Sequence, residues 1–276
     1  MAGYPGMTHL PPDLPNLLQS ALAATRAAAS FVAEGWRTHP ATDHKRARVD
    51  LVTRFDRESE TLLREALLRT TPFPVVGEEA GGEPAPGAEA ATWYVDPLDG
   101  TTNFVHGHPF WCVSVGLLAG GNPVLGVVVA PSLHVEWTGL AGDNAYRNGV
   151  RCEVSEVAHL DDALLATGFP YDRRTSDDNN FETFAAIKRK CQAVRRCGSA
   201  AIDLCLVADG TYDGYWEKKL GPWDVAAGSA IALAARGRIT DYAGRPADLT
   251  NGEVVATNGR IHDELVAELG AAMSRG

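Results

Sequence analysis

The chain has 276 residues, of which 45% are hydrophobic, and its formal net charge is −10 at pH 7. This size and composition are typical of a soluble globular protein with one large domain or two lobes. The acidic charge argues against nucleic acid or an anionic membrane as the main partner, because both need a basic surface. The sequence contains no apolar run of about 18 residues, so it predicts no transmembrane helix.

The N-terminal segment and the cysteines favour a cytoplasmic protein. Residues 1–16 are rich in proline and lack the basic start and apolar core of a signal peptide, so we expect a flexible tail. The five cysteines form no CxxC pair and their number is odd, which favours free thiols in a reducing compartment over a zinc site. His106 and His108 are interpreted as loop or surface residues.

Helices and strands are expected to alternate along the chain, which predicts a layered α/β or α+β fold. Apolar spacing predicts a first helix over 17–34, then a polar, mobile loop over 35–50, and a second helix that begins at a capping box from Thr53 to Asp56. Strand patterns occur at 75–82, 92–96, 113–118, 124–131, 212–217 and 254–258, with the third and fourth forming a hairpin. Further helices are expected at 181–191, 200–210, 222–237 and 261–273.

Acidic residues lie at the ends of several of these elements. Asp96 and Asp99 directly follow an apolar strand, Glu78 follows another strand, and Asp224 opens the buried helix. Two carboxylates about 5 Å apart repel each other by roughly 3 kcal/mol at an effective dielectric constant near 20, so a cation or a bound proton should accompany them. Clustered carboxylates next to apolar segments favour a site for a hard cation such as Mg²⁺.

Each acid also fits a purely structural role. Asp56 fits a helix cap, Asp224 fits a favourable position near a helix N-terminus, and Glu78 with Glu79 fits solvated loop charges. The pair Asp96 and Asp99 is hardest to account for in this way, because one apolar strand leads into both and a glycine follows at once.

The segment Gly100-Thr101-Thr102 adds groups that can bind an anion. Glycine allows close approach of the backbone, and free N–H groups at the start of a helix can contact a phosphate. Metal ions held beside such a loop can activate a water molecule for in-line displacement at phosphorus. The competing chemistry uses an aspartate nucleophile in the motif Asp-x-Asp-Gly-Thr, but here the nucleophile position is occupied by Pro97, which cannot attack.

Five segments together resemble the inositol monophosphatase family of magnesium-dependent, lithium-sensitive phosphatases. They are LVTRFD (51–56), GEE (77–79), DPLDGTTNF (96–104), GSAAIDLCLVADGTYDGYWE (198–217) and PWDVAAG (222–228). The resemblance spans about residues 17–273. It implies an α/β/α/β/α sandwich, a homodimer, and one catalytic domain over 17–276 with lobes of about 17–155 and 156–276.

The resemblance also implies roles for individual residues. Two or three Mg²⁺ ions would be bound by Glu78, Asp96, the carbonyl of Leu98, Asp99 and Asp224. The catalytic residues would be Asp56, Thr101 and Glu78, with Asp56 and Thr101 orienting and deprotonating a metal-bound water. The substrate would contact Asp99, Gly100, Thr101, Gly198, Ser199, Ala200, Glu217 and Asp224. Ser199 replaces a common threonine of the family and keeps the hydroxyl.

The resemblance specifies the type of reaction better than it specifies the substrate. GTTNF (100–104) is similar to the branch that hydrolyses inositol 1-phosphate, whereas the nucleotide branch tends towards GTKEF. Relatives with this motif hydrolyse histidinol phosphate or fructose 1,6-bisphosphate, and a regulatory binding protein on the same scaffold is a further alternative. Residues 166–180 are expected to border the substrate.

Overall fold

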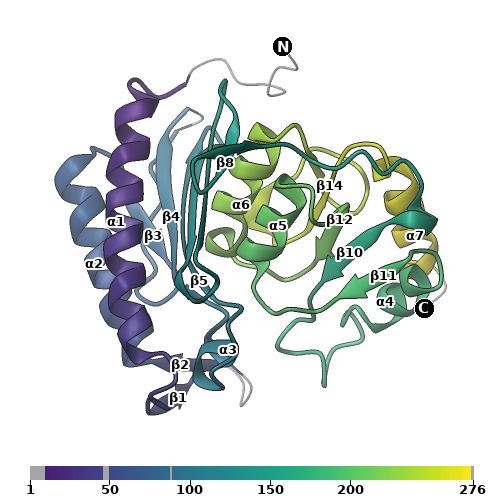
Figure 1. Cartoon of the computed structure of the whole chain (residues 1–276), viewed down its shortest axis with the longest axis horizontal. Coiled ribbons are helices and arrows are strands. Elements are labelled where there is room, and N and C mark those ends of the chain that lie inside the picture. The colour runs from purple at the N-terminus through teal and green to yellow at the C-terminus, as the bar shows by residue number, and fades with distance from the viewer. Residues whose placement is uncertain (1–9, 46–49, 88, 275–276) are drawn as a thin grey trace.

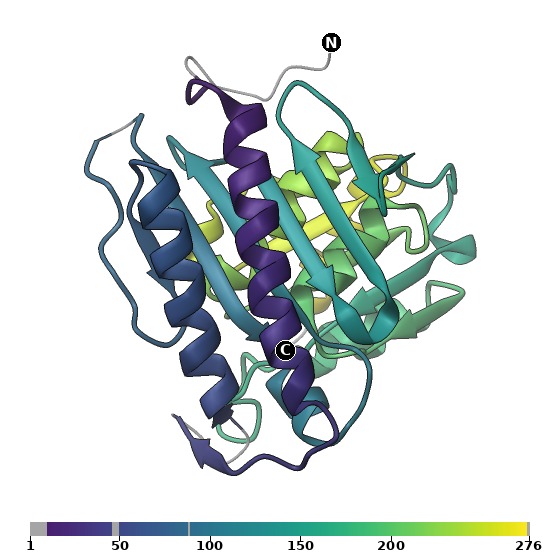
Figure 2. The same ribbon diagram turned by 60° about the vertical axis from the view of Figure 1, so that its left-hand side comes forward.

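The computed structural model describes residues 10–45, 50–87 and 89–274, which form five stacked layers (Figure 1). The first layer consists of α1 (Leu14–Gly35) and α2 (Arg54–Thr70), which pack against one face of the first sheet. Figure 2 shows both helices covering one face of this sheet. Their buried apolar residues and those of the sheet form one core cluster, which includes Leu63, Trp93 and Val115.

The first sheet has seven strands in the order β3-β4-β5-β6-β7-β8-β9. Apart from the parallel pair of β3 and β4, neighbouring strands run antiparallel. The strands are Val75–Gly77, Ala91–Asp99, Cys112–Ala119, Asn122–Ala130, Val135–Leu140, Ala145–Arg147 and Val150–Cys152. A separate antiparallel pair consists of β1 (Thr42–His44) and β2 (Leu51–Thr53).

The third layer, α5 (Ala200–Ala208) and α6 (Pro222–Ala234), lies between the two sheets. The second sheet has the order β11-β10-β12-β14-β13. Its strands, in chain order from β10 to β14, are Leu164–Thr167, Ala193–Arg195, Gly214–Glu217, Arg238–Thr240 and Val254–Thr257. The outer layer consists of α4 (Phe181–Lys188) and α7 (His262–Met273), which contact each other. Short 3₁₀ helices occur at Pro131–Leu133, Leu160–Asp162 and Leu249–Asn251.

Helix α6 packs unusually close to the first sheet because three strands present a glycine to it. A Cβ atom added at Gly116 would lie 2.5 Å from the backbone nitrogen of Ala227, and one at Gly126 would lie 2.1 Å from the Ala227 carbonyl oxygen. Gly139 makes a similar approach to Ile231. Since real Cβ atoms do not come so close to backbone atoms, only glycine fits at these positions. These contacts fix the middle of α6 against β5, β6 and β7.

The layered α/β sandwich predicted from the sequence is confirmed, but several elements differ. Helix α1 begins at Leu14 and not at residue 17, because Pro15 is favourable in a first turn and Leu14 is buried. Part of the expected loop over 35–50 is strand β1, whose exposed side chains give no apolar signal; residues 46–49 lie outside the described residues. Strands β7 to β11 and β13 were not predicted, and most of them are only three or four residues long. In the described ranges, no helix is both long and apolar enough to cross a bilayer.

Candidate active site

Asp56 lies in the first turn of α2 and accepts hydrogen bonds from Thr53, directly before the helix, and from Thr101, which is distant in the sequence. Its Oδ2 accepts hydrogen bonds from the backbone nitrogen (2.8 Å) and the hydroxyl (2.6 Å) of Thr53, which completes the predicted capping box. Its Oδ1 accepts a 2.9 Å hydrogen bond from Thr101 Oγ1. Burial raises the pKa of the Asp56 carboxyl, and these hydrogen bonds oppose the rise. Capping and a contact with Thr101 are therefore compatible roles for one side chain.

A bulge in β4 places Asp96 and Asp99 on the same face of the strand. Residues three positions apart in a regular strand point to opposite faces. Here Asp96 pairs with Ser114 and Asp99 pairs with Cys112, so three steps along β4 match two steps along β5. The extra residue of a bulge re-aims the side chain that follows it. Pro97 lies within the bulge, where a missing N–H does not break the ladder.

Asp99 also connects the first sheet to helix α5. Its Oδ2 accepts hydrogen bonds from Ser199 Oγ (2.7 Å) and from the backbone nitrogen of Ala201 (2.8 Å) at the start of α5. Burial raises the pKa of Asp99 to about 6, against the opposing effect of these hydrogen bonds. The residues of GSAA (198–201) thus meet the carboxylate that lies about a hundred positions earlier in the chain.

Glu78 follows β3, and Lys45, which carried no motif in the sequence, lies beside it. Lys45 Nζ is 2.7 Å from a Glu78 carboxylate oxygen, and it also contacts Glu79. Burial raises the pKa of Glu78 to about 7, while Lys45 lowers it. Lys45 therefore supplies part of the positive charge that the clustered acids require.

A buried carboxylate from α2 fixes the turn that carries Glu78. Glu60 accepts hydrogen bonds from the backbone nitrogens of Glu79 (2.7 Å) and Ala80 (3.0 Å). It also forms an ion pair with Arg64 at 2.9 Å. A Cβ atom at Gly77 would lie 2.3 Å from the Glu60 carboxyl carbon, so glycine is needed for this approach. The glycine of GEE is thus explained by packing.

Asp224 lies in the first turn of α6, where its Oδ2 accepts a 2.6 Å hydrogen bond from the backbone nitrogen of Gly221. Burial raises the pKa of Asp224 well above its usual value, and the negative charges of Glu78 and Asp99 raise it further. The pKa of Asp96 is raised by burial and then by Glu78, Asp99 and Asp224. Four acids from three distant segments therefore share one electrostatic environment.

The chemistry of these four acids fits a hard divalent cation, because all their donor atoms are oxygens and they repel each other without a counter-charge. The hydrogen bonds of Asp96 and Asp224 to backbone nitrogens engage one oxygen of each carboxylate and leave the second oxygen for a ligand. Within the described ranges, no three His, Cys, Asp or Glu side chains already converge at metal-ligand spacing. The four acids are nevertheless close enough to raise one another's pKa values, and Glu78 is held by Lys45.

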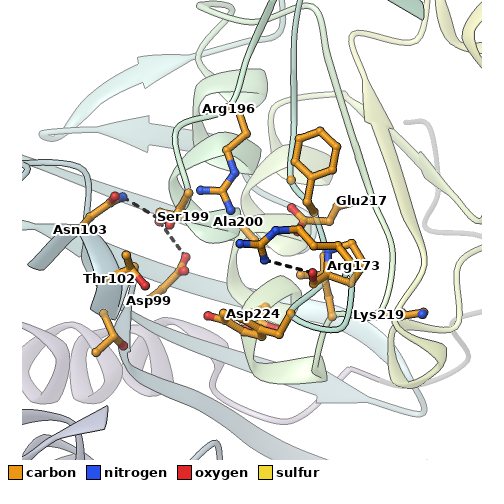
Figure 3. Close-up of a pocket in the computed structure, with 18 of the residues that line it drawn as sticks. Asp99, Thr102, Asn103, Arg173, Arg196, Ser199, Ala200, Glu217, Lys219 and Asp224 are labelled. Carbon is orange, nitrogen blue, oxygen red and sulfur yellow. Dashed lines mark hydrogen bonds between the residues drawn. The ribbon is translucent and has the colours of Figure 1, made fainter. Parts of the chain in front are cut away.

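A cavity of about 530 Å³ lies beside this cluster, between the two sheets (Figure 3). This volume is in the usual range for small-molecule sites. Of the residues predicted from the sequence, the cavity is lined by Asp99, Gly100, Thr101, Gly198, Ser199, Ala200, Glu217 and Asp224. Asp56, Glu78, Asp96 and Leu98 lie outside its lining. The carbonyl of Leu98 accepts a 3.1 Å hydrogen bond from Thr101 Oγ1.

Glu217 ends β12 and lies at the wall of the cavity opposite Thr102 and Asn103 (Figure 3). Its Oε2 accepts a 2.6 Å hydrogen bond from the Tyr215 hydroxyl. Burial raises the pKa of Glu217 to about 7, and the Tyr215 hydrogen bond lowers it. A Cβ atom at Gly168 would overlap the Glu217 carboxylate at 2.0 Å, so a glycine there makes room for the acid.

The sequence analysis did not identify some of the residues at the site. Asn103 Nδ2 donates hydrogen bonds to the carbonyls of Phe110 (2.6 Å) and Cys197 (2.8 Å). These bonds connect the segment that follows Gly100 to the segment before α5. Arg196 also lines the cavity and carried no motif. Of the segment 166–180, which was expected to border the substrate, residues 168–171 and 173 line the cavity.

Comparison with known proteins agrees with this architecture. The model of the "Inositol monophosphatase family" matches residues 13–274. The inositol-1-monophosphatase of Synechocystis is 41% identical over 261 residues, covering 95% of this chain and 91% of the relative. The Nus factor SuhB of Pasteurella multocida is 34% identical over 260 residues, covering 94% of this chain and 97% of the relative.

Solved structures show the same similarity to inositol monophosphatases. The inositol monophosphatase from Anabaena superposes with a TM-score of 0.84 at 38% identity, covering 94% of this chain and 97% of that one. The family match over nearly the whole chain, together with this fold, identifies the chain as an enzyme of the inositol monophosphatase family.

Proposed function

We propose that the chain hydrolyses the phosphate ester of a small polyol or sugar phosphate, with inositol 1-phosphate as the preferred substrate. The observation that carries the proposal is the gathering of Glu78, Asp96, Asp99 and Asp224 beside the hydrogen-bonded pair of Thr101 and Asp56. The sequence similarity to inositol monophosphatases supports this choice of substrate.

Glu78, Asp96, the carbonyl of Leu98, Asp99 and Asp224 would hold two or three Mg²⁺ ions. Bound cations would neutralise the phosphate and lower the pKa of water, which is the chemistry that such ions supply in phosphatases. Li⁺ is expected to inhibit, as in the family that the sequence resembles. The carboxylates would then be ionised, since the counter-charge removes the repulsion that raises their pKa values.

Thr101 and Asp56 would form the proton path. Thr101 Oγ1 accepts the proton of the attacking water while its own proton passes to Asp56 Oδ1, which lies 2.9 Å away. General-base help of this kind is worth about 10²–10⁴-fold in rate. Pro97 occupies the place where a covalent mechanism needs a nucleophilic carboxylate, so the proposal is a single in-line displacement.

The substrate would lie in the cavity between the sheets. The backbone amides of Gly100 and Thr101 would hold the phosphate, with Gly100 at a φ of 93°, a conformation that suits glycine. Gly198, Ser199, Ala200 and Glu217 would contact the polyol hydroxyls, with Asp99 and Asp224. A carboxylate such as Glu217 accepts hydrogen bonds from hydroxyl groups, which would favour polyols over simple alkyl phosphates.

Phosphate release from inositol 1-phosphate, histidinol phosphate, fructose 1,6-bisphosphate and 3′-phosphoadenosine phosphate, with Mg²⁺ or with excess chelator, tests the proposal. Inositol 1-phosphate should give the highest kcat/KM, and the chelator should abolish activity. Full turnover in excess chelator would refute the role of a metal, and a preference for another ester would reassign the substrate.

A second candidate is regulatory, and the similarity to a protein named Nus factor SuhB supports it. Such a role would use the surface of the same fold and would survive the loss of catalysis. An Asp96→Asn variant that lacks phosphatase activity but still corrects the growth defect of a deletion strain would support a regulatory role. The homodimer and the cytoplasmic location remain predictions, which sedimentation and fractionation can test.

A further inference from the structure

Tyr171 lies in the loop between β10 and α4, and this loop is closed at its base by Asn180. Asn180 Nδ2 donates hydrogen bonds to Thr167 Oγ1 (2.9 Å) and to the carbonyl of Gly168 (2.6 Å), and its Oδ1 accepts one from Trp216 Nε1 at 3.0 Å. The side chains of Thr167, Asn180 and Trp216 are buried. The two ends of the loop are therefore fixed to each other and to β12.

The residues on either side of Tyr171 are held as well. Asp172 Oδ2 forms a 2.8 Å ion pair with Lys219 Nζ, which follows β12. Arg173 Nη1 donates a 3.2 Å hydrogen bond to the carbonyl of Pro170, which closes the turn around Tyr171. Figure 3 shows the side chains of Arg173 and Lys219 on the same side of the cavity. The backbone of Tyr171 is thus positioned by contacts of its own chain.

The side chain of Tyr171, in contrast, is open to the cavity. It lines the cavity together with Asp99, Thr101 and Asp224. Its exposed fraction is 55%, whereas the buried tyrosines of the core are at most 7% exposed. Among the residues that the structure describes, no group forms a hydrogen bond with its hydroxyl. An aromatic ring with an unengaged polar tip in a small-molecule cavity is available to a ligand.

The hydroxyl of Tyr171 lies near the acid cluster. The enclosing walls of the cavity raise the pKa of this hydroxyl by burial, and the negative charges of nearby acids raise it further. In order of effect these acids are Glu78, Asp224, Asp50 and Asp99. Charges in salt solution act appreciably over only about 10 Å, so the side chain reaches towards acids of several other segments. The phenol remains protonated there and acts as a hydrogen-bond donor.

We propose that the Tyr171 hydroxyl donates a hydrogen bond to the phosphate group of the substrate, which makes Tyr171 a further catalytic residue. The inference rests on the proposed phosphatase function, in which the backbone amides of Gly100 and Thr101 hold the same phosphate. Glu217, at the proposed polyol end of the cavity, is not among the charges that act most strongly on the Tyr171 hydroxyl, which favours the phosphate end. The segment after β4 and the loop after β10 thus hold one phosphate between them.

The chemistry of a tyrosine suits this position. A neutral phenol has one O–H donor, and hydrogen bonds to an ionised phosphate oxygen are shorter and about twice as strong as those between neutral groups. Because the flanking residues are already held, substrate binding orders only the side chain, which keeps the entropic cost small. Removal of the hydroxyl should therefore weaken phosphate binding without disturbing the fold.

The test compares two substrates in the full-length, Mg²⁺-loaded protein. Inositol 1-phosphate carries both a phosphate and a polyol, whereas 4-nitrophenyl phosphate carries a phosphate and no polyol. The variant Tyr171→Phe removes only the hydroxyl. The matched control is Tyr146→Phe, because Tyr146 lies on β8, is half-buried and does not line the cavity. The readout is kcat/KM for each substrate.

We expect Tyr171→Phe to lose about 10- to 100-fold in kcat/KM on both substrates, as for one hydrogen bond to a charged group. The control should change neither value by more than about threefold. A loss on inositol 1-phosphate alone would place the hydroxyl at the polyol and overturn the inference, as would no loss on either substrate.

Binding measurements separate this inference from the proposed function and from a contact with the metal. Calorimetric titration with inorganic phosphate in the presence of Mg²⁺ should show weaker binding to Tyr171→Phe than to the wild type and the control. This comparison decides even if the wild type hydrolyses neither ester. Equal phosphate affinity in all three proteins, or no phosphate binding by any of them, would refute the inference. Stabilisation by Mg²⁺ alone should be the same in Tyr171→Phe and the wild type, and a selective loss would assign the hydroxyl to the metal instead.

Discussion

The hydroxyl of Thr101 donates a 2.9 Å hydrogen bond to Oδ1 of Asp56, which connects the start of α3 (Thr101–Val105) to the first turn of α2. The same carboxylate caps α2 through Thr53. One buried acid thus sets the start of a helix and holds the hydroxyl that lines the cavity. The geometry couples a structural role to the proposed proton path.

The first prediction concerns this pair. Thr101→Ala should lower kcat by about 10²–10⁴-fold with little change in KM, because the proposed base is lost while the backbone amide of residue 101 remains. Thr101→Ser should restore most of the rate, since it keeps the hydroxyl. Steady-state kinetics on inositol 1-phosphate measures both. A Thr101→Ala enzyme with normal kcat would exclude the proposed proton path.

The second prediction concerns how the stability of the metal-free protein depends on pH through its buried acids. In the folded protein the pKa of Glu78 is about 7 against 4.5 for the free group, mainly because of burial. A raised carboxyl pKa means that the native state binds more protons than the unfolded state, so stability falls as the pH rises from about 4.5 to about 7. The melting temperature of the protein in excess chelator should therefore decrease over this window. An increase would contradict the sign of the shift.

Asp96→Asn gives the matching mutational prediction. The variant replaces a buried carboxyl whose ionised form is disfavoured by burial and by Glu78, Asp99 and Asp224, so in chelator at pH 8 it should melt higher than the wild type, by about 2–4 °C for each 1 kcal/mol gained. Mg²⁺ should stabilise the wild type through ligand linkage but not the variant. The control is Asp263→Asn, which removes an exposed acid paired with Arg238. It should change little in either the melting temperature in chelator or the stabilisation by Mg²⁺. Normal Mg²⁺ stabilisation of Asp96→Asn would argue against Asp96 as a ligand.

The fourth prediction concerns Glu217 and its partner. The pKa of Glu217 is about 7, and the Tyr215 hydrogen bond holds it below the value that burial alone would give. At saturating Mg²⁺, KM should rise as the pH falls through this value, because a protonated Glu217 accepts fewer hydrogen bonds. Tyr215→Phe should move the inflection to higher pH. Tyr212→Phe, whose hydroxyl contacts Cys197 and not Glu217, should leave it unchanged.

The last prediction concerns the glycines under α6. Gly126→Ala should destabilise the fold by about 1–3 kcal/mol, because the added methyl group would lie 2.1 Å from the carbonyl oxygen of Ala227. Gly270→Ala is the control: nothing lies within 4 Å of its added Cβ atom, and alanine is favoured in a helix by up to about 1 kcal/mol. Urea unfolding of both variants measures the difference. Equal stability of Gly126→Ala and the wild type would contradict the close packing.

The sequence by itself determined the long elements of the fold. Helix α2 was predictable from its capping box, and β5 with β6 from apolar runs joined by a glycine turn, because these signals act between residues close in the chain. The residue types around the cavity were likewise predictable, since acids and glycines at the ends of apolar strands are typical of a ligand site. The short strands β8 and β9 were not, because three residues carry too little periodicity.

The tertiary structure alone decided how these residues meet. Asp96 and Asp99 share a face only because of a bulge, and register shifts depend on the partner strand. Lys45 reaches Glu78 across 33 positions, and Ser199 reaches Asp99 across 100 positions. Such contacts depend on burial and on distances between remote segments, and neither of these is encoded in local sequence patterns.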